Sequence, residues 1–208
     1  MPFAHTHAFE PAGELVLWRI QETPAWFFEN LSLSKNLWRE FHEITAQSVR
    51  VQWLASRFAL QQVAKAVDMD IHKDHFGKPH LVNDSRFISI SHCQGYAAAI
   101  AAEAPVGVDV EVVSSRVQRI KDRFLSVQEQ SLLGPTDEAL MLAWSAKESV
   151  YKMHGEKKLL FKEQMVIEAQ DLDAGQLHVR LILPATEQLL RVRYQFINNC
   201  VLSWVVLD

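Results

Sequence analysis

The segment 135–155 constrains the fold of this chain more than any other. Thr136 and Asp137 follow a proline and can supply N-cap oxygens, good helix formers come next, and Gly155 stands where helices commonly end. The pattern predicts a helix from Glu138 to Lys152, about four to five turns long. We expect the rest of the chain to be arranged around this helix.

Two charged side chains share one face of the predicted helix. Glu148 and Lys152 are four residues apart and so project to the same side, with Trp144 one turn earlier. Such pairs are common on exposed helices and stabilise them by only about 0.2–0.5 kcal/mol. A solvent-exposed face is therefore the simplest interpretation of this pair taken alone.

A second segment, 106–113, predicts a strand that carries two carboxylates on one side. Its valines alternate with Gly107, Asp109 and Glu111, so the acids share the face opposite the valines. That face could simply be in contact with water. Together with Glu148, the acids could instead bind Mg²⁺, which prefers oxygen ligands and fills its other positions with water and substrate phosphates. This second interpretation indicates a phosphorylated substrate.

Short motifs along the chain resemble those of the Sfp-type 4′-phosphopantetheinyl transferases, in the same order. They cover roughly residues 50–161. The matching pieces are GKP at 77–79, ISISH at 88–92, GVDVE at 107–111, RFL at 123–125, and WSAKE at 144–148 followed by Lys152. The segment 156–161 departs from the family pattern, because it lacks the glycine that many relatives carry there.

The resemblance implies an α+β fold of two similar halves related by a pseudo-two-fold axis, with coenzyme A and the metal in a cleft between them. Ala104 and Pro105 are a plausible boundary. We therefore expect an N-terminal half, 1–104, with contacts to the coenzyme A phosphates and nucleotide. The C-terminal half, 105–208, would hold the metal ligands and the catalytic helix. A monomer is expected, since two halves in one chain would complete the cleft.

The resemblance also implies a reaction, in which the 4′-phosphopantetheine arm of coenzyme A moves to a serine of an acyl, peptidyl or aryl carrier protein. Asp109, Glu111 and Glu148 are the expected ligands of Mg²⁺, with Mn²⁺ also possible. Lys152, and with it Lys147, would stabilise charge on the phosphates. Glu148 is the expected general base, directly or through a metal-bound water, with Glu111 as the alternative. Asp109, Glu148 and Lys152 are thus the expected catalytic residues.

The first half is expected to supply further coenzyme A contacts. Arg57 is the first candidate and Arg50 the second, because in the family an arginine near a pair like Trp53-Leu54 reaches a coenzyme A phosphate; both could otherwise be exposed helix arginines. The GKP motif could be a plain turn, and the Ser-His pair could serve only in capping or packing. The full set of expected coenzyme A contacts is Arg57, Lys78, Pro79, Ser91, His92, Lys147 and Lys152.

Patterns elsewhere predict ordinary core elements. Strands are expected at 14–20, 87–91, 177–183, 190–196 and 200–207, helices after Thr23-Pro24 and at 44–67, and a polar loop at 69–85. The alanine-rich segment 96–103 favours a helix by propensity. The resemblance makes it a strand, and we follow the resemblance. His5 and His7 are expected in a frayed tail.

Composition excludes several classes of protein. The net charge of −4 gives no general attraction to nucleic acid or to an anionic membrane, and two cysteines without CxxC spacing indicate neither a disulfide framework nor a zinc site. No apolar run is long enough to span a bilayer, and we find no signal-peptide pattern, so the expected location is the cytoplasm.

The segment 116–125 is basic and then apolar, and it could bind an acidic carrier protein by charge and by apolar contact. It could equally be a charged amphipathic helix without a partner. Its residues are Arg116, Arg119, Lys121, Arg123, Phe124 and Leu125.

Two other functions are compatible with the same residues. One is a Mg²⁺-dependent nuclease or phosphohydrolase, which also uses acids on a strand near a lysine. The chain lacks the broad basic stripe that nucleic-acid binding favours. The other is a non-catalytic protein that binds coenzyme A or a carrier, although such a protein has little need for a general base.

Overall fold

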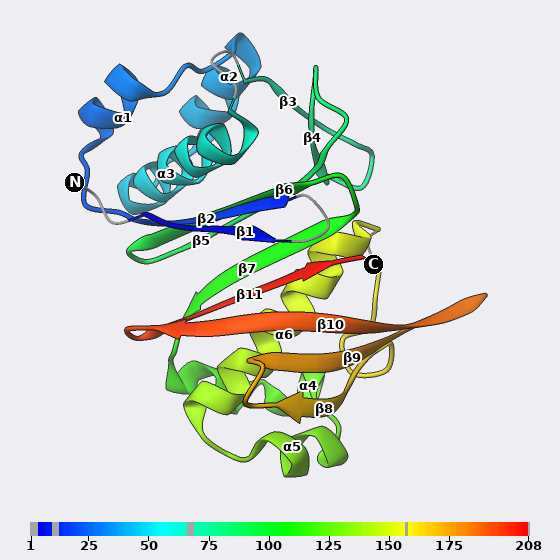
Figure 1. Cartoon of the computed structure of the whole chain (residues 1–208). Coiled ribbons are helices and arrows are strands. Elements are labelled where there is room, and N and C mark those ends of the chain that lie inside the picture. The colour runs from blue at the N-terminus through cyan, green and yellow to red at the C-terminus, as the bar shows by residue number, and fades with distance from the viewer. Residues whose placement is uncertain (1–3, 10–12, 66–68, 157, 208) are drawn as a thin grey trace. The chain divides into compact units, whose positions relative to one another are not determined.

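The chain forms two compact α+β units, which confirms the predicted fold class. The computed structural model describes residues 4–9, 13–65, 69–156 and 158–207. Unit 1 extends to Val106 and unit 2 runs from Gly107 to Leu207. Each unit combines one sheet with several helices (Figure 1).

Unit 1 contains a six-stranded sheet with the order β1-β2-β6-β5-β4-β3. All neighbouring strands in it are antiparallel. The strands are β1 (Ala4–Phe9), β2 (Gly13–Arg19), β3 (Ile71–Lys73), β4 (Pro79–Leu81), β5 (Phe87–Cys93) and β6 (Tyr96–Ala102), and the helices are α1 (Pro24–Asn30), α2 (Lys35–Glu43) and α3 (Gln47–Ala64).

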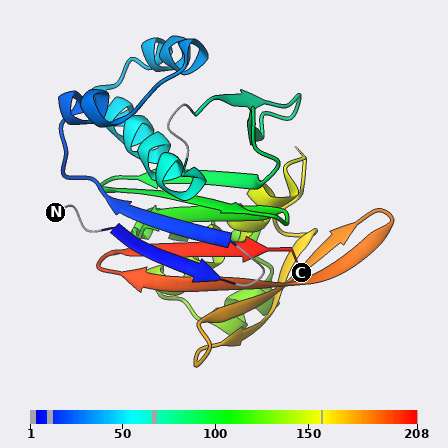
Figure 2. The same cartoon turned by 45° about the horizontal axis from the view of Figure 1, so that its top comes forward.

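Helix α3 lies across one face of this sheet, over β2, β6 and β5 (Figures 1 and 2). The helix has no glycine or proline, and its side chains from Trp53 to Leu60 are buried. It packs on β6, where Ala97, Ala99 and Ala101 belong to the same core. The alanine-rich segment is therefore a strand, as the resemblance implied. Because β6 is hydrogen-bonded on both sides and must leave room for a helix, packing overrides its helix propensity.

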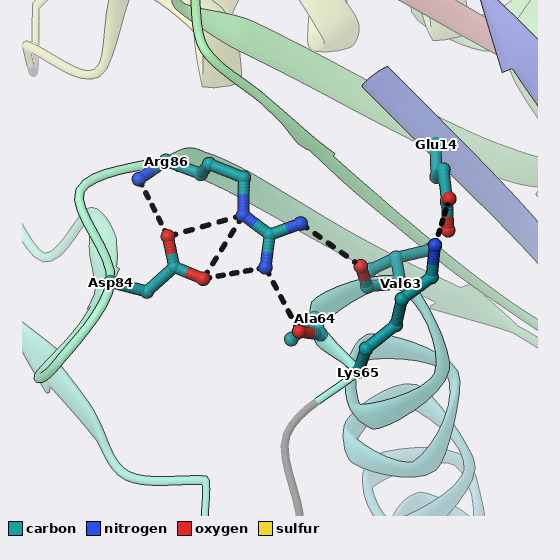
Figure 3. A network of polar contacts seen from close by, with 6 residues as sticks. All are labelled: Glu14, Val63, Ala64, Lys65, Asp84 and Arg86. Atoms are coloured by element: carbon teal, nitrogen blue, oxygen red, sulfur yellow. Dashed lines mark hydrogen bonds and ion pairs between the residues drawn. The ribbon is translucent and has the colours of Figure 1, made fainter. Parts of the chain in front are cut away.

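The C-terminal end of α3 is held by a polar network drawn in Figure 3. Arg86 donates to the carbonyl oxygens of Val63 at 3.3 Å and Ala64 at 2.9 Å, two acceptors left open at the helix end. Asp84 binds the same guanidinium at 2.5 Å, and Lys65 adopts the left-handed conformation that ends the helix. The network fixes the helix to the loop that leads into β5.

Some elements of unit 1 differ from the sequence predictions. His5 and His7 are not in a frayed tail, because the backbone of β1 pairs with Leu17 and Leu15 of β2. The predicted polar loop at 69–85 contains the β3–β4 hairpin. Helix α2 begins with a Ser34 cap and was not predicted.

Unit 2 contains a five-stranded sheet with the order β7-β11-β10-β9-β8. The strands are β7 (Val106–Val112, which starts at the last residue of unit 1), β8 (Met165–Asp171), β9 (Gln176–Leu183), β10 (Thr186–Ile197) and β11 (Cys200–Val206), and the helices are the 3₁₀-helix η1 (Ser115–Arg119), α4 (Lys121–Phe124), α5 (Val127–Leu133) and α6 (Asp137–His154).

Helix α6 is the element on which the sequence predictions were centred. It begins after Thr136, whose hydroxyl accepts from the backbone N–H of Ala139, and it ends at Gly155 in the left-handed conformation. Its predicted ends are therefore confirmed. No helix among the described residues is long and apolar enough to cross a membrane.

Candidate active site

Strand β7 and helix α6 approach each other more closely than a side chain would allow. A Cβ atom built on Gly107 would lie 1.9 Å from the carbonyl oxygen of Ser149 and 2.7 Å from the backbone nitrogen of Met153. Every residue other than glycine would collide with the helix backbone at this point. Gly107 thus sets the distance between the strand and the helix that carry the predicted site residues.

Three buried serines fix α6 against the neighbouring strand β11. The Ser203 hydroxyl lies 2.8 Å from that of Ser145 and 2.6 Å from that of Ser149, and Ser149 also donates to the Ser203 carbonyl oxygen at 3.0 Å. All three side chains are fully buried. Because buried hydroxyls need partners, these bonds define how far the helix can slide along the sheet.

The closest contact between the predicted site residues joins Asp109 and Lys152. The ammonium group of Lys152 lies 2.7 Å from Oδ1 of Asp109. Asp109 is buried, whereas Lys152 is about a quarter exposed. The pair therefore connects β7 to the last turn of α6 at the edge of the buried interior.

Two further carboxylates lie near that pair. The pKa of Glu111 is raised to about 7, first by burial, then by the negative charge of Asp109 and, least, by that of Glu148, while Lys152 and the Trp144 side chain act in the opposite direction. Burial and Asp109 also raise the pKa of Glu148, again opposed by Lys152. We call Asp109, Glu111, Glu148 and Lys152 the acid cluster. Asp109 and Glu111 come from one face of β7, and Glu148 and Lys152 come from one face of α6, as the sequence patterns indicated.

The donor set of the acid cluster suits a hard divalent cation. The negative charge of Asp109 raises the pKa of both Glu111 and Glu148, so added positive charge would stabilise the group, and carboxylate oxygens are the ligands that Mg²⁺ prefers. Across the described ranges, however, no three His, Cys, Asp or Glu side chains converge on one metal position. One oxygen of Asp109 binds Lys152. The chemistry of the residues thus fits a metal, and the metal site itself stays a proposal.

Lys147 requires a correction. It was predicted to contact coenzyme A, but its side chain is fully buried inside unit 2. Its Nζ lies 2.6 Å from Oε1 of Glu129 and donates to the carbonyl oxygens of Phe124 at 2.6 Å and Phe161 at 2.9 Å. These partners use all three N–H groups of the ammonium. Lys147 is therefore a structural lysine.

Arg57 lies in unit 1 and is not the exposed helix arginine of the alternative interpretation. It is buried, with its guanidinium 4.1 Å from the centre of the Trp53 ring and 3.6 Å from Glu40. Burial lowers its pKa to about 10. Its Nε has no hydrogen-bond partner among the described residues. Arg50, the second candidate, is half-buried and donates to the Ile44 carbonyl oxygen at 2.6 Å.

The other candidates of unit 1 lie on β5 and near the β3–β4 hairpin. Asp74 accepts a hydrogen bond from the backbone N–H of Lys78, which fixes the turn, and burial lowers the pKa of the Lys78 ammonium. Pro79 is the first residue of β4. Ser91 is buried in β5, and Nδ1 of His92 lies 3.1 Å from Oε1 of Gln52 on α3.

Two partners of these side chains were not predicted from the sequence. Glu40 lies between Arg57 and Lys73, and Glu129 pairs with Lys147. The only signal for Glu129 was local: Ser126 and Glu129 have the spacing of a capping box, which the structure forms at the start of α5.

The segment that carries these residues of unit 2 matches a known family model. Residues 105–203 match the model of the 4′-phosphopantetheinyl transferase superfamily. The matched segment covers just under half of the chain. It contains the carboxylate-bearing part of β7, the whole of α6 and every member of the acid cluster.

Similar proteins include enterobactin synthase component D of Salmonella typhi, which is 37% identical over 83 residues, and that of Salmonella austin, which is 40% identical over 81 residues. The protein of the same name from Salmonella typhimurium is 35% identical over 83 residues. The matches cover 36–37% of this chain and 34–36% of the relatives, so this chain matches about a third of their length.

The close approach at Gly107 gives a first testable prediction. Gly107→Ala should lower the free energy of unfolding by about 3 kcal/mol, because its Cβ meets helix backbone that cannot move independently. Urea unfolding measures the loss. Gly134→Ala is the control, since its Cβ meets nothing within 4 Å and only the positive φ costs stability, about 1–2 kcal/mol. A smaller loss for Gly107→Ala than for the control would contradict the packing argument.

The raised pKa of Glu111 predicts a dependence of stability on pH. Between pH 4.5 and about 7 the folded protein keeps a proton that the unfolded chain has lost, so wild-type stability falls as pH rises through this window. In metal-free buffer with a chelator, Glu111→Gln should therefore be more stable than wild type at pH 8, with a smaller difference at pH 5. Urea unfolding at the two pH values checks this, and an equal difference at both would refute it.

Proposed function

We propose that this protein transfers the 4′-phosphopantetheine arm of coenzyme A to a serine of an acyl, peptidyl or aryl carrier protein. The observation that carries the proposal is the acid cluster, which lies within the segment that matches the superfamily model. The name of the similar Salmonella proteins, enterobactin synthase component D, adds support, because it describes a component of a synthase. We further propose that the protein acts as a monomer in the cytoplasm.

In the proposed reaction the serine oxygen of the carrier attacks the phosphorus on the pantetheine side of the coenzyme A diphosphate. The bond from this phosphorus to the bridging oxygen breaks, and adenosine 3′,5′-bisphosphate leaves with the electron pair. Lys152 is the proposed residue that stabilises negative charge on the diphosphate, and its partial exposure beside Asp109 supports this role. Asp109 holds the lysine in that position.

The proton of the serine hydroxyl must be accepted by a base, and Glu148 is the proposed one. Its raised pKa brings the carboxylate closer to neutral pH, which favours proton transfer. Glu111, with a pKa of about 7, is the alternative base. Both belong to the acid cluster, so either carboxylate can accept the proton while the other stays ionised.

Asp109, Glu111 and Glu148 are the proposed ligands of a Mg²⁺ ion, for which Mn²⁺ could substitute. When bound, such an ion offsets the charge of the diphosphate and makes its phosphorus more electrophilic. The carboxylates also keep the local charge negative, which attracts the ion to this part of unit 2.

Unit 1 supplies the other proposed coenzyme A contacts. Arg57 is suited to a phosphate, because it is buried, always charged at neutral pH and has an Nε without a hydrogen-bond partner among the described residues. Lys78, Pro79, Ser91 and His92 stay in the proposal from their resemblance to the family motifs. Lys147 leaves it, because its ammonium group is fully used inside unit 2.

Mass spectrometry of the carrier tests the proposed function. Incubated with Mg²⁺, coenzyme A and an apo carrier, the wild-type protein should make the carrier heavier by one 4′-phosphopantetheine group. Glu148→Gln should slow the transfer on the order of 10²–10⁴-fold, because it removes the base. Glu138→Gln, a change of an exposed glutamate at the start of the same helix, should leave the rate unchanged.

The same experiment separates the other functions. A phosphohydrolase would cleave coenzyme A and leave the carrier mass unchanged, and a non-catalytic binding protein would change neither. A carrier that gains no mass with the wild-type protein, across a panel of acyl, peptidyl and aryl carriers, would refute the transferase proposal.

The basic segment 116–125 is the proposed docking surface for the carrier. Arg116, Arg119 and Arg123 are exposed, while Phe124 and Leu125 are buried, so charge and not apolar contact is what this segment offers. Carrier proteins of this kind are generally acidic, and opposite charges speed association and fix orientation.

Reversal of one of these charges tests the docking surface. Arg119→Glu should raise KM for the carrier about tenfold or more and leave KM for coenzyme A within about twofold, because a charge change at a docking surface acts on the partner that binds there. Arg39→Glu makes the same change at an exposed site in unit 1 and should alter neither constant. Unchanged KM for the carrier in Arg119→Glu would show that it docks elsewhere.

A further inference from the structure

The guanidinium of Arg57 in unit 1 is a buried cation with few hydrogen bonds. Its side chain is 7% exposed, and the Trp53 ring covers one of its faces at 4.1 Å, so its donors can meet a partner only at the edges. Among the described residues it donates one hydrogen bond, from Nη1 to the Ser56 hydroxyl at 3.0 Å. A guanidinium has five N–H donors, and buried donors without partners cost free energy.

The donors that lack a hydrogen bond lie on one edge of this guanidinium. In every arginine the Nε–H and one N–H of Nη2 point the same way, and this edge binds two oxygens of a carboxylate or a phosphate together. Nε of Arg57 has no hydrogen-bond partner among the residues that the structure describes. Nη2 lies 3.6 Å from Oε2 of Glu40, which is beyond hydrogen-bonding distance. The edge is therefore close to an anion that does not satisfy it.

Glu40 is shared with a second cation. Its Oε1 lies 2.9 Å from Nζ of Lys73, so α2, α3 and β3 each supply one charged group at this point of unit 1. The exposed fraction of the side chain rises from 7% for Arg57 to 32% for Glu40 and 48% for Lys73. An anion from solution can thus approach the two cations from the Lys73 side.

The two cations are matched poorly by the one carboxylate between them. Their charges exceed its charge by one, and ion pairs with this much exposure stabilise a protein little. A phosphate monoester carries about two negative charges at neutral pH and has three strong acceptor oxygens. It would satisfy both the open edge of Arg57 and the ammonium group of Lys73. The partly exposed Glu40 side chain is free to rotate toward solvent when such an anion arrives.

We propose that Arg57 and Lys73 form a binding site for a phosphate group, and that Glu40 is its internal counter-ion, which the phosphate displaces. The choice of coenzyme A as the molecule that brings the phosphate rests on the proposed function. Lys73 is a phosphate contact outside the set expected from the sequence. Glu40 orders the two cations in the free protein and lowers the affinity for the ligand.

Isothermal titration calorimetry with coenzyme A tests the counter-ion. Glu40→Gln should lower Kd about three- to tenfold, because no carboxylate then competes with the phosphate. Lys73→Met should raise Kd about tenfold, because one of the two cations is lost. Glu43→Gln and Lys35→Met make the same charge changes at exposed positions of α2, and both should leave Kd within about twofold of wild type.

Dephospho-coenzyme A, which keeps the diphosphate but lacks the 3′-phosphate, identifies the group that binds. If Glu40→Gln tightens binding of coenzyme A but not of dephospho-coenzyme A, the site holds the 3′-phosphate. If it tightens both, the site holds the diphosphate. Either result supports the counter-ion role.

A second readout does not depend on coenzyme A. The Nε–H resonance of Arg57, assigned by its absence in Arg57→Lys, should shift when inorganic phosphate is added, because the ion binds at that edge. In Glu40→Gln the shift should saturate at a phosphate concentration about three- to tenfold lower than in wild type. Glu43→Gln should titrate like wild type.

The outcomes separate this inference from the proposed function. Unchanged or weaker binding of coenzyme A in Glu40→Gln, or an Arg57 resonance that phosphate does not shift, would overturn the counter-ion role. A wild-type protein that transfers nothing to any carrier would refute the proposed function alone. In that case the phosphate titration still decides whether Arg57, Lys73 and Glu40 act as described.

Discussion

The contact on which unit 2 depends is the backbone approach of β7 to α6 at Gly107. The helix carbonyl of Ser149 occupies the place where any other residue would have a Cβ atom. Two residues further along the same face of the strand, Asp109 meets Lys152 at 2.7 Å, so the short distance between strand and helix is what brings the two side chains within reach. The buried serines of α6 and β11 then fix the helix along its axis.

This geometry concentrates like charges at a cost in stability. Burial and the negative charge of Asp109 raise the pKa of both Glu111 and Glu148, and Lys152 offsets only part of this effect. A fold gains nothing from such a group of acids, whereas groups with shifted pKa values are characteristic of catalytic sites. Elsewhere on α6, Lys147 forms a buried ion pair with Glu129, and the remaining polar groups of both side chains are hydrogen-bonded to other residues of unit 2. The same helix thus carries one ion pair whose polar groups all have partners, and one glutamate of the acid cluster whose pKa is raised.

Local patterns predicted the elements whose signals are local. Helix α6 was found with both ends, because Thr136 and Gly155 act within one turn, and β7 was found from its alternation. The strand β6 needed the family resemblance, since alanines favour a helix until a sheet and α3 surround them. The members of the acid cluster were predicted because Asp109 and Glu111 share one face of β7, and Glu148 and Lys152 share one face of α6. The burial of Lys147 could not be predicted, because it depends on Glu129 and on carbonyl oxygens 14 and 23 residues away.

The central claim is that the acid cluster binds a divalent metal and acts on the diphosphate of coenzyme A. A crystal structure grown with Mg²⁺ and coenzyme A tests it most directly. The account predicts one metal ion bound by oxygens of Asp109, Glu111 and Glu148, with the diphosphate completing its coordination and Lys152 beside the phosphate oxygens. A diphosphate bound away from these residues, or a metal ion held by other side chains, would contradict it.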